Sequence, residues 1–378
     1  MPNGWEKHPV GKICSSIVPG RNKPKQFGGD IAWVTTPEIT GKFIPSSVQE
    51  NYISEETIKE CGGKIVPKGA VVMAAVGDLG LIAITKEEVV LNQQLHAFVC
   101  SSKINNEFLA YWLGTQTPYM ESVASKTTIL YLNKTNCESI PVLVPPILEQ
   151  QKIANILSTW DKAISTTERL IDNSTQQKKA LMQQLLTGKK RLLDESGKPF
   201  DKKWERIELG KLLDYKQPTP YLVKSTDYSD EYPTPVLTAG KTFILGYTDE
   251  EFGIFSEDLP TIIFDDFTTA SKFVDFPFKA KSSAMKMLVA KDGVSIKYIF
   301  EVMQALSYAI GGHQRHWISI FANIVIGLPC REEQQKITAV SNNADKEIEL
   351  LEQQLADLQQ EKKALMQVLL TGKKRVVV

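Results

Sequence analysis

The run Glu149-Gln150-Gln151-Lys152-Ile153 recurs 184 residues later as Glu333-Gln334-Gln335-Lys336-Ile337. The match continues without a gap to Leu185-Leu186-Thr187-Gly188-Lys189-Lys190-Arg191 and its copy Leu369-Leu370-Thr371-Gly372-Lys373-Lys374-Arg375. A period this long exceeds those of solenoid repeats and indicates a duplicated module. The chain therefore alternates twice between a unit of its own character and a shared segment.

Both shared segments carry the pattern of a long helix. Their side chains form two series with a seven-residue period, displaced by four, which predicts a coiled-coil seam. Prolines precede each segment and Gly188 and Gly372 end them, as helix boundaries require. About 40 residues at roughly 1.5 Å per residue give a helix of about 60 Å. The residues expected to pair the helices are Ile153, Leu157, Trp160, Ile164, Ile171, Leu181, Leu185, Ile337, Ala344, Ile348, Leu351, Leu355, Leu358, Leu365 and Leu369.

The pattern predicts an α+β fold. We expect two mixed α/β domains related by pseudo-twofold symmetry and separated by an antiparallel coiled coil of the two long helices. The expected boundaries are 1–145 and 194–328 for the domains, and 146–193 and 329–378 for the helices. The alternative is two separate helices that each recruit other proteins.

The two units share a frame but little else. Each begins with a Trp–Glu–basic triplet, at Trp5 and at Trp204, and each ends with a strand that leads into its long helix. Helices are expected over 105–113 in the first unit and 295–310 in the second. Between these anchors the sequences differ, which indicates that the duplication kept the scaffold while other surfaces diverged.

Composition sets broad limits. The chain has 378 residues, 44 basic and 44 acidic side chains and 42% hydrophobic residues, values typical of a soluble globular protein with more than one domain. We see no apolar stretch long enough to span a membrane and no N-terminal signal core. Five cysteines without CxxC spacing favour reduced thiols, so we expect a cytoplasmic location.

Few residues suggest catalysis. Ala239-Gly240-Lys241-Thr242 resembles the end of a phosphate-binding loop, but Pro235 occupies the place of its first glycine. His313 and His316 lack further ligands at metal-binding spacing. Asp265-Asp266 follows an apolar run, and we interpret it as a turn at a strand end. We therefore expect a binding protein with no catalytic residues, no metal and no cofactor of its own.

Two variable units that alternate with two near-identical helices resemble the specificity subunit of type I restriction–modification systems. The local parts of the resemblance are the run from Val144 to Ile153 and the weaker run from Leu328 to Ile337, where Cys330 replaces Pro146. The resemblance covers essentially the whole chain.

The resemblance implies a function. In that family the variable units are target-recognition domains, each reading one half of a split DNA sequence. The helices set the unread gap and dock two methylation subunits, which bind S-adenosylmethionine, and motor/nuclease restriction subunits can join them. The implied partners are double-stranded DNA and these subunits, with no membrane, and the chain itself is not an enzyme.

DNA reading requires polar and basic side chains on loops. The best single candidate is the run from Gly311 to Trp317, whose glycines permit close backbone approach. As a hypothesis, the residues that contact DNA are Arg21, Lys23, Lys25, Thr35, Thr36, Asn92, Gln93, Gln94, Lys126 and Thr127 in the first unit, and Thr268, Thr269, Ser271, Lys272, Lys279, Lys281, His313, Gln314, Arg315 and His316 in the second.

Two alternatives remain. One is a coiled-coil scaffold or regulator without DNA specificity, in which the helices recruit effectors. The other is a single-chain restriction–methylation enzyme, which the missing catalytic motifs disfavour. Neither explains why the two units share anchors but not contents.

Overall fold

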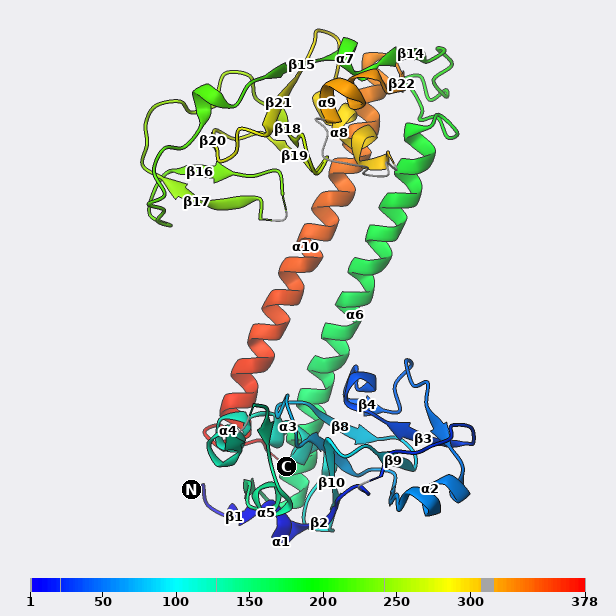
Figure 1. Ribbon diagram of the computed structural model, residues 1–378, viewed down its shortest axis with the longest axis vertical. Helices are drawn as coiled ribbons and strands as arrows, with labels where there is room; N and C mark the ends of the chain where they lie inside the picture. Colours follow the sequence, from blue (N-terminus) through cyan, green and yellow to red (C-terminus); the bar gives the residue numbers. More distant parts are fainter. Residues whose placement is uncertain (1, 21, 127, 241, 307–315, 378) are drawn as a thin grey trace. The chain divides into compact units, whose positions relative to one another are not determined.

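The computed structural model describes residues 2–20, 22–126, 128–240, 242–306 and 316–377 (Figure 1). The chain divides into two compact units. Unit 1 combines Met1–Thr167 with Gln354–Val378, and unit 2 is the continuous segment Glu168–Gln353. Each unit contains one sheet domain and a part of each long helix. We describe each unit by itself.

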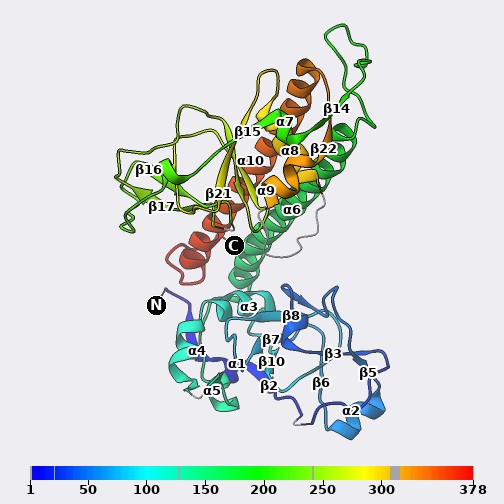
Figure 2. The same cartoon turned by 45° about the horizontal axis from the view of Figure 1, so that its top comes forward.

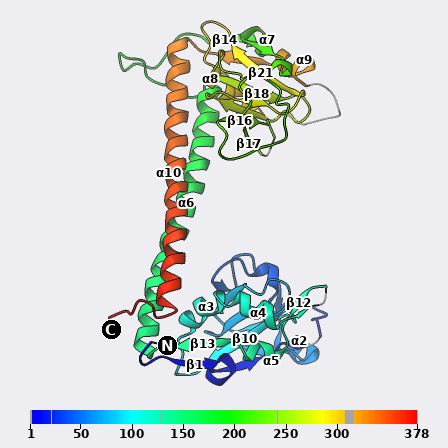
Figure 3. The ribbon, with the colours of Figure 1, turned by 90° about the vertical axis from the view of Figure 1, so that its left-hand side faces the viewer.

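The long helices are α6 (Ile147–Leu186) and α10 (Arg331–Leu369). Unit 1 holds the first half of α6 and the last part of α10, and unit 2 holds the remainder of both. All 15 residues expected to pair the helices are buried or half-buried, as are the polar seam residues Thr167 and Ser341. Within each unit the two helical parts lie side by side (Figures 1 and 3).

A repeated cluster of tryptophan, glutamate and arginine fixes the direction of the helices in each unit. In unit 1, Arg375 donates two hydrogen bonds to Glu149, at 2.7 and 2.8 Å, and Trp5 Nε1 donates a third at 3.1 Å. The start of α6 therefore lies beside the residues that follow α10. The helical parts of unit 1 are antiparallel.

Unit 2 contains the same cluster with the roles of the copies exchanged. Arg191, which follows α6, donates to Glu333 at 2.6 and 2.8 Å, and Trp204 Nε1 donates at 3.0 Å. Glu333 sits in the first turn of α10 and is 1% exposed. Its buried charge requires these partners, because an unpaired buried carboxylate is strongly destabilising.

The cluster also shifts proton affinities. Burial raises the pKa of Glu149, but the hydrogen bonds from Arg375 and Trp5 outweigh it and hold that pKa below its usual range. The hydrogen bonds to Glu333 raise the pKa of Arg191. Glu149 and Arg191 therefore remain charged at neutral pH.

The glutamine after each of these glutamates joins the helix to its sheet domain. Gln150 donates to the Pro145 carbonyl at 2.8 Å and accepts from the Asn105 amide at 2.8 Å. Gln334 donates to the Pro329 carbonyl at 2.9 Å and accepts from the Ser295 amide at 2.8 Å. Asn105 and Ser295 cap the helices that were expected over 105–113 and 295–310, so the repeated Glu-Gln pair links three segments in each unit.

The sheet domain of unit 1 contains a five-stranded sheet in the order β2-β10-β7-β8-β4 and a four-stranded sheet in the order β5-β3-β9-β6, with two small antiparallel pairs, β1-β13 and β11-β12. The strands are β1 (Glu6–Pro9), β2 (Cys14–Ile17), β3 (Ile31–Val34), β4 (Phe43–Ile44), β5 (Tyr52–Ile53), β6 (Ile65–Val66), β7 (Val71–Ala74), β8 (Ile82–Thr85), β9 (Val89–Leu91), β10 (Leu95–Cys100), β11 (Ser125–Lys126), β12 (Leu130–Tyr131) and β13 (Pro141–Val144). The helices are α1 (Val10–Ile13), η1 (Thr36–Glu38), α2 (Glu55–Cys61), α3 (Asn106–Gly114), α4 (Thr117–Val123) and α5 (Lys134–Glu138).

The core of unit 1 joins the sheet to the long helices. Helix α3 packs on β7 and β8 (Figure 2), and buried Phe98 and Phe108 belong to one apolar cluster with Ile153 and Leu157 of α6 and Leu369 of α10. The helical segments are therefore part of the domain core, not additions to it.

The sheet domain of unit 2 repeats this frame, with fewer strands among its described residues. Its sheets have the orders β15-β21-β18-β19, β17-β16-β20 and β14-β22. The strands are β14 (Glu205–Glu208), β15 (Leu213–Lys216), β16 (Thr234–Leu237), β17 (Ile244–Thr248), β18 (Thr261–Asp265), β19 (Ser271–Val274), β20 (Lys279–Ala280), β21 (Met285–Ala290) and β22 (Val325–Leu328). The helices are α7 (Leu209–Leu212), η2 (Thr219–Tyr221), α8 (Ile296–Ala305), α9 (His316–Ser319) and η3 (Phe321–Asn323).

Together these elements confirm the predicted α+β class with two mixed α/β domains and two long helices. The predicted helix over 105–113 corresponds to α3. The helix predicted over 295–310 is shorter, because α8 ends at Ala305, and residues 307–310 lie outside the described residues. Among the described residues, the structure contains no helix that is both long and apolar enough to cross a membrane.

His96 is a buried ionisable residue in the core of unit 1. His96 on β10 is 2% exposed, and its Nε2 atom has no hydrogen-bond partner among the described residues. Burial lowers the pKa of His96 to about 4. The unfolded chain, with a histidine pKa of about 6.5, therefore takes up a proton that the folded chain excludes.

We predict that unit 1 loses about 3 kcal/mol of stability as the pH falls from about 6.5 to about 4, because only the unfolded state is protonated in this range. Below about pH 4 this contribution is fully lost and becomes constant. The His96→Gln variant should lack this slope, and His8→Gln, which changes a partly exposed histidine, should retain it. Urea unfolding across this pH range measures both.

We also predict that Arg191→Ala lowers the free energy of unfolding of unit 2 by about 3 kcal/mol, because it leaves Glu333 buried without its main partner. Arg191→Lys should be intermediate, since lysine cannot form the bidentate pair. Hydrogen exchange in unit 2 reports the change. Lys190→Ala, at the exposed neighbouring position, is the control, and equal losses for the two alanine variants would contradict the assignment.

Candidate nucleic-acid interface

The carboxyl ends of two parallel strands form one edge of the unit 1 domain. Strand β3 pairs in parallel with β9, so Thr35-Thr36 and the segment from Asn92 to Gln94 leave the sheet together. The Asn92 amide donates to the Val34 carbonyl at 3.0 Å. Thr36 Oγ1 donates to Gln94 Oε1 at 3.2 Å. Two polar clusters that were expected from the sequence are therefore adjacent.

A third predicted cluster joins the same edge through Ala75, the residue after β7. The Ala75 amide donates to the Gln94 carbonyl at 2.7 Å, and the Ala75 carbonyl accepts from the Leu132 amide at 2.8 Å. The β11–β12 hairpin, which contains Lys126, precedes Leu132 directly. Thr127 lies outside the described residues. The loops after β3, β9 and β7 and the β11–β12 hairpin form what we call the unit 1 edge.

The Glu38 carboxylate supports the unit 1 edge by accepting hydrogen bonds from the loops beside it. Its carboxylate accepts from Thr35 N at 2.8 Å, from Thr35 Oγ1 at 2.7 Å and from Asn51 Nδ2 at 3.1 Å. Burial raises the pKa of Glu38, but these hydrogen bonds outweigh it and the pKa is lowered. The Thr35 hydroxyl therefore donates to a carboxylate within the domain. Thr36 is half-buried, and Gln93 and Gln94 are exposed.

The predicted basic loop of unit 1 lies over Trp33 of β3. Lys23 Nζ is 6.0 Å from the centroid of the Trp33 ring, and the Phe27 ring is 5.5 Å from it. Lys23 and Lys25 are exposed, as phosphate contact requires. Arg21 lies outside the described residues.

Unit 2 has an equivalent edge, fixed by equivalent backbone hydrogen bonds. Strands β16 and β20 are parallel, and the Lys281 amide donates to the Leu237 carbonyl at 3.0 Å. The Asp266 amide donates to the Ala284 carbonyl at 3.1 Å, and the Asp266 carbonyl accepts from the His316 amide at 3.0 Å. Residues that make the same backbone hydrogen bond occupy equivalent positions in the two units. Lys281 of unit 2 is therefore equivalent to Asn92 of unit 1, Asp266 is equivalent to Ala75, and His316 is equivalent to Leu132.

Two predicted contacts in unit 2 are wrong. Lys279 is fully buried, where its ammonium pairs with Glu250 at 3.0 Å and donates to the Phe252 carbonyl at 2.5 Å. His316 is also fully buried, and its Nδ1 lies 2.9 Å from the Asp266 carbonyl. Lys279 is a structural cation inside β20, and His316 occupies a core position that corresponds to buried Leu132.

In unit 1, the prediction that Asn92 contacts DNA is only partly supported. It is 8% exposed, and its Oδ1 accepts from the Gln94 amide at 3.1 Å while its Nδ2 donates to Gln94 Oε1 at 3.2 Å. Asn92 therefore shapes the loop that presents Gln93 and Gln94. The sequence did not distinguish this supporting role from direct contact.

The turn between β18 and β19 presents the predicted threonines. Asp265 Oδ1 accepts from the amides of Phe267 and Thr268 at 3.0 and 2.7 Å, which confirms the interpretation of the Asp265-Asp266 pair as a strand-end turn. Thr268 is exposed, and Thr269 has φ +60°, a conformation that is uncommon for a residue other than glycine.

The other predicted residues of unit 2 are half-buried. Ser271 Oγ accepts from Gln304 Nε2 at 2.8 Å, Lys272 Nζ lies 6.0 Å from the Phe243 ring centroid, and Lys281 Nζ donates to Tyr228 Oη at 2.9 Å. His313, Gln314 and Arg315 lie outside the described residues.

The sequence reasoning missed exposed aromatic residues on both edges. Phe267, at the β18–β19 turn, is 47% exposed, and Tyr131, at the end of β12, is 45% exposed. Apolar contact with thymine methyl groups and stacking on bases both use such residues. The available signal was an aromatic residue inside a polar turn, between Asp266 and Thr268.

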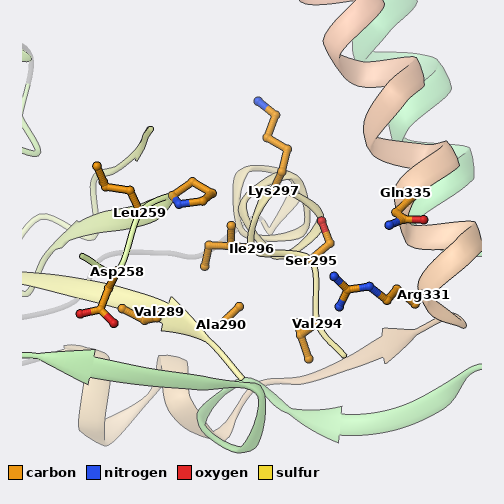
Figure 4. Close-up of a pocket in the computed structure, with 11 residues that line it drawn as sticks. Asp258, Leu259, Val289, Ala290, Val294, Ser295, Ile296, Lys297, Arg331 and Gln335 are labelled. Atoms are coloured by element: carbon orange, nitrogen blue, oxygen red, sulfur yellow. The ribbon is translucent and has the colours of Figure 1, made fainter. Parts of the chain in front are cut away.

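Two of the pockets lie at corresponding places in the two units. One in unit 2, of about 400 Å³, lies between the first turn of α8, β21 and the start of α10, where Asp258, Ser295, Arg331 and Gln335 line it (Figure 4). One of about 350 Å³ in unit 1 is lined by the corresponding segments, including Asn105, Ile147 and Gln151. Among the described residues, no group of three or more His, Cys, Asp or Glu side chains could hold a metal ion.

Comparison with known proteins shows which family of proteins this chain resembles. Residues 2–173 match the family described as the type I restriction modification DNA specificity domain. The type I restriction enzyme EcoR124I/EcoR124II specificity subunit of Escherichia coli is 50% identical over 143 residues, which cover 36% of this chain and 35% of that protein. The MjaVIII specificity subunit of Methanocaldococcus jannaschii is 23% identical over 100% of this chain and 94% of that protein.

A third relative, the MjaIX specificity subunit of the same archaeon, is 27% identical over 45% of this chain and 40% of that protein. The chain thus spans 35% and 40% of the lengths of the first two curated relatives that it matches. Together these relatives confirm the resemblance predicted from the sequence. The chain is similar to type I restriction–modification specificity subunits over its whole length.

Two solved structures share the fold. The type I restriction–modification S subunit from M. genitalium has a TM-score of 0.63 at 16% identity and covers 98% of this chain and 97% of that one. A chain from a structural study of complex assembly and conformational transition of the type I system has a TM-score of 0.56 at 15% identity and covers 98% of both chains. At these identities the likeness supports the fold.

We predict that Gln94→Ala weakens specific DNA binding about tenfold, because a glutamine amide that contacts a base contributes about 1–3 kcal/mol. The side-chain oxygen Oε1 of Gln94 accepts hydrogen bonds from Thr36 Oγ1 and Asn92 Nδ2. These bonds orient the side-chain NH2 group of Gln94. Gln359→Ala, at an exposed position on α10, is the control. Unchanged affinity and base preference would remove the unit 1 edge from the interface.

Proposed function

We propose that this chain is the non-catalytic DNA specificity subunit of a type I restriction–modification complex in the cytoplasm. Its two sheet domains are the target-recognition domains, and each reads one half of an asymmetric, bipartite DNA sequence. The observation that carries the proposal is the pair of edges: equivalent backbone hydrogen bonds hold both, while the residues at several equivalent positions differ, with Lys281 in place of Asn92 and His316 in place of Leu132.

The chemistry of the edges supports DNA as the ligand. Thr36, Gln93 and Gln94 in unit 1 and Thr268 and Lys281 in unit 2 offer the hydrogen-bonding groups that base and phosphate contacts need. The net charge of zero is compatible with this reading if other subunits provide part of the phosphate contact. Different side chains on one frame would give different half-sites.

The long helices support a role in spacing and assembly. We propose that they set the unread gap and dock two methylation subunits, with restriction subunits as possible further partners. The S-adenosylmethionine site would belong to the methylation subunits. Two equivalent units in one chain suit two copies of one partner.

The test is co-expression with the methylation subunit of the same system, followed by sequencing of methylated adenines in host DNA. We expect one bipartite motif with a fixed gap. Exchange of residues 194–328 for the corresponding domain of a relative should change one half-site and leave the other unchanged. A complex that assembles but yields no motif would support the scaffold reading instead.

A further inference from the structure

An aspartate on each long helix lies where three segments of its unit meet. In unit 1, Asp161 of α6 forms an ion pair with Lys362 of α10 at 2.5 Å. In unit 2, Asp345 of α10 forms an ion pair with Lys178 of α6, also at 2.5 Å. Asp161 and Asp345 are 184 residues apart, as are Lys178 and Lys362, so the duplication placed the same pair in both units.

Each aspartate also meets a cation from its sheet domain. Lys42, in the loop before β4, lies 3.5 Å from Asp161. Lys42 is held by Glu107 and Tyr111 of α3, each at 2.7 Å from its Nζ. The Tyr111 hydroxyl in turn donates to Asp161. Asp161 is thereby tied to the other helix and to the domain.

Unit 2 achieves the same connection with a different residue. Lys297, at the second position of α8, lies 3.8 Å from Asp345 and 3.1 Å from Glu301. The rings of Phe273 and Phe300 surround it at 4.9 and 5.1 Å. Lys297 corresponds to Glu107 of α3, so the domain cation was not inherited with the helix pair.

The two networks differ in how far they are shielded from solvent. The side chains of Lys42, Asp161 and Lys362 in unit 1 are 20–27% exposed. In unit 2, Lys297 is 19% exposed but Asp345 is 45% exposed. Shielded charge networks couple their members more strongly than surface ion pairs. Both networks therefore resist rotation or sliding of the domain relative to its helical segments, and the network of unit 1 does so more strongly.

We propose that Asp161 and Asp345 are positioning residues for target recognition. Each carboxylate fixes the orientation of a reading domain on its helices and so restricts the DNA gap that the complex accepts to one length. The proposal rests on the proposed function. Its physical basis is that a domain with a loosened attachment reaches half-sites displaced by a base pair or more.

The test uses the assembled methylation complex and sequencing of methylated adenines. The Asp161→Asn variant keeps the size of the side chain and removes its charge. We expect it to increase methylation at gaps one base pair longer or shorter by roughly tenfold, a change that lies within the range of interaction energies typical of residues in one charge network. Both half-site sequences should remain unchanged. Asp345→Asn should have the same effect to a smaller degree, and Asp172→Asn, at an exposed position on α6, should have none.

Two further variants separate the two attachments of Asp161. Lys42→Met removes the domain cation but leaves the pair with Lys362, and should also broaden the gap. Asp161→Lys combined with Lys362→Asp restores an ion pair between the helices but places the introduced ammonium group against Lys42, so the broad gap should persist. If this double variant regains a single gap, the domain attachment is not responsible and the proposal is overturned.

The remaining outcomes distinguish a failure of this inference from a failure of the proposed function. If the variants methylate the single wild-type gap, at normal or reduced levels, the aspartates stabilise the fold without positioning the domains, and this inference is wrong while the proposed function stands. If the wild-type complex itself shows no bipartite motif, the proposed function fails. Thermal unfolding of each variant verifies that it is folded.

Discussion

The bidentate arginine–glutamate pair at the start of each long helix is the interaction on which the rest of the structure depends. It connects the first turn of one helix, the residues after the other helix and the tryptophan that opens the sheet domain. The arginine that binds Glu149 comes from the second copy of the repeat, and the arginine that binds Glu333 comes from the first. Neither copy completes a unit alone. The duplication is therefore maintained by exchange between the copies and not by two independent folds.

Once this frame is fixed, the edges of the domains are free to differ. Backbone hydrogen bonds hold the loops after the parallel strands in the same places in both units, and they impose no requirement on the side chains. Asn92 is thus replaced by Lys281 and Leu132 by His316. A protein that must recognise varied sequences gains from this division, because a change at the edge leaves the core intact.

The sequence predicted the parts of the structure that depend on repetition and periodicity. The long helices, the seam residues and the α+β class follow from apolar spacing and from the 184-residue shift. The partner of each repeated glutamate did not follow, because Arg375 is 226 residues from Glu149 and only the tertiary fold brings them together. Lys279 and His316 were misassigned for a related reason. Whether a polar residue beside a strand faces solvent or a buried partner such as Glu250 depends on contacts distant in sequence. Thr36 and Gln94 are adjacent in space because the parallel strands β3 and β9 end at one edge, and the sequence pattern did not predict this pairing.

The chain order of the two units has a consequence for biosynthesis. Unit 2 is one continuous segment, so the ribosome delivers all of its contacts, including the Arg191–Glu333 pair, before residues 354–378 are made. Unit 1 begins first but lacks its final helical segment and Arg375 until unit 2 is complete. Domains usually mature in the order of translation. Here, however, every residue that unit 2 needs for its contacts is in place before the last helical segment of unit 1 is made, so the unit that begins first is the last to be completed.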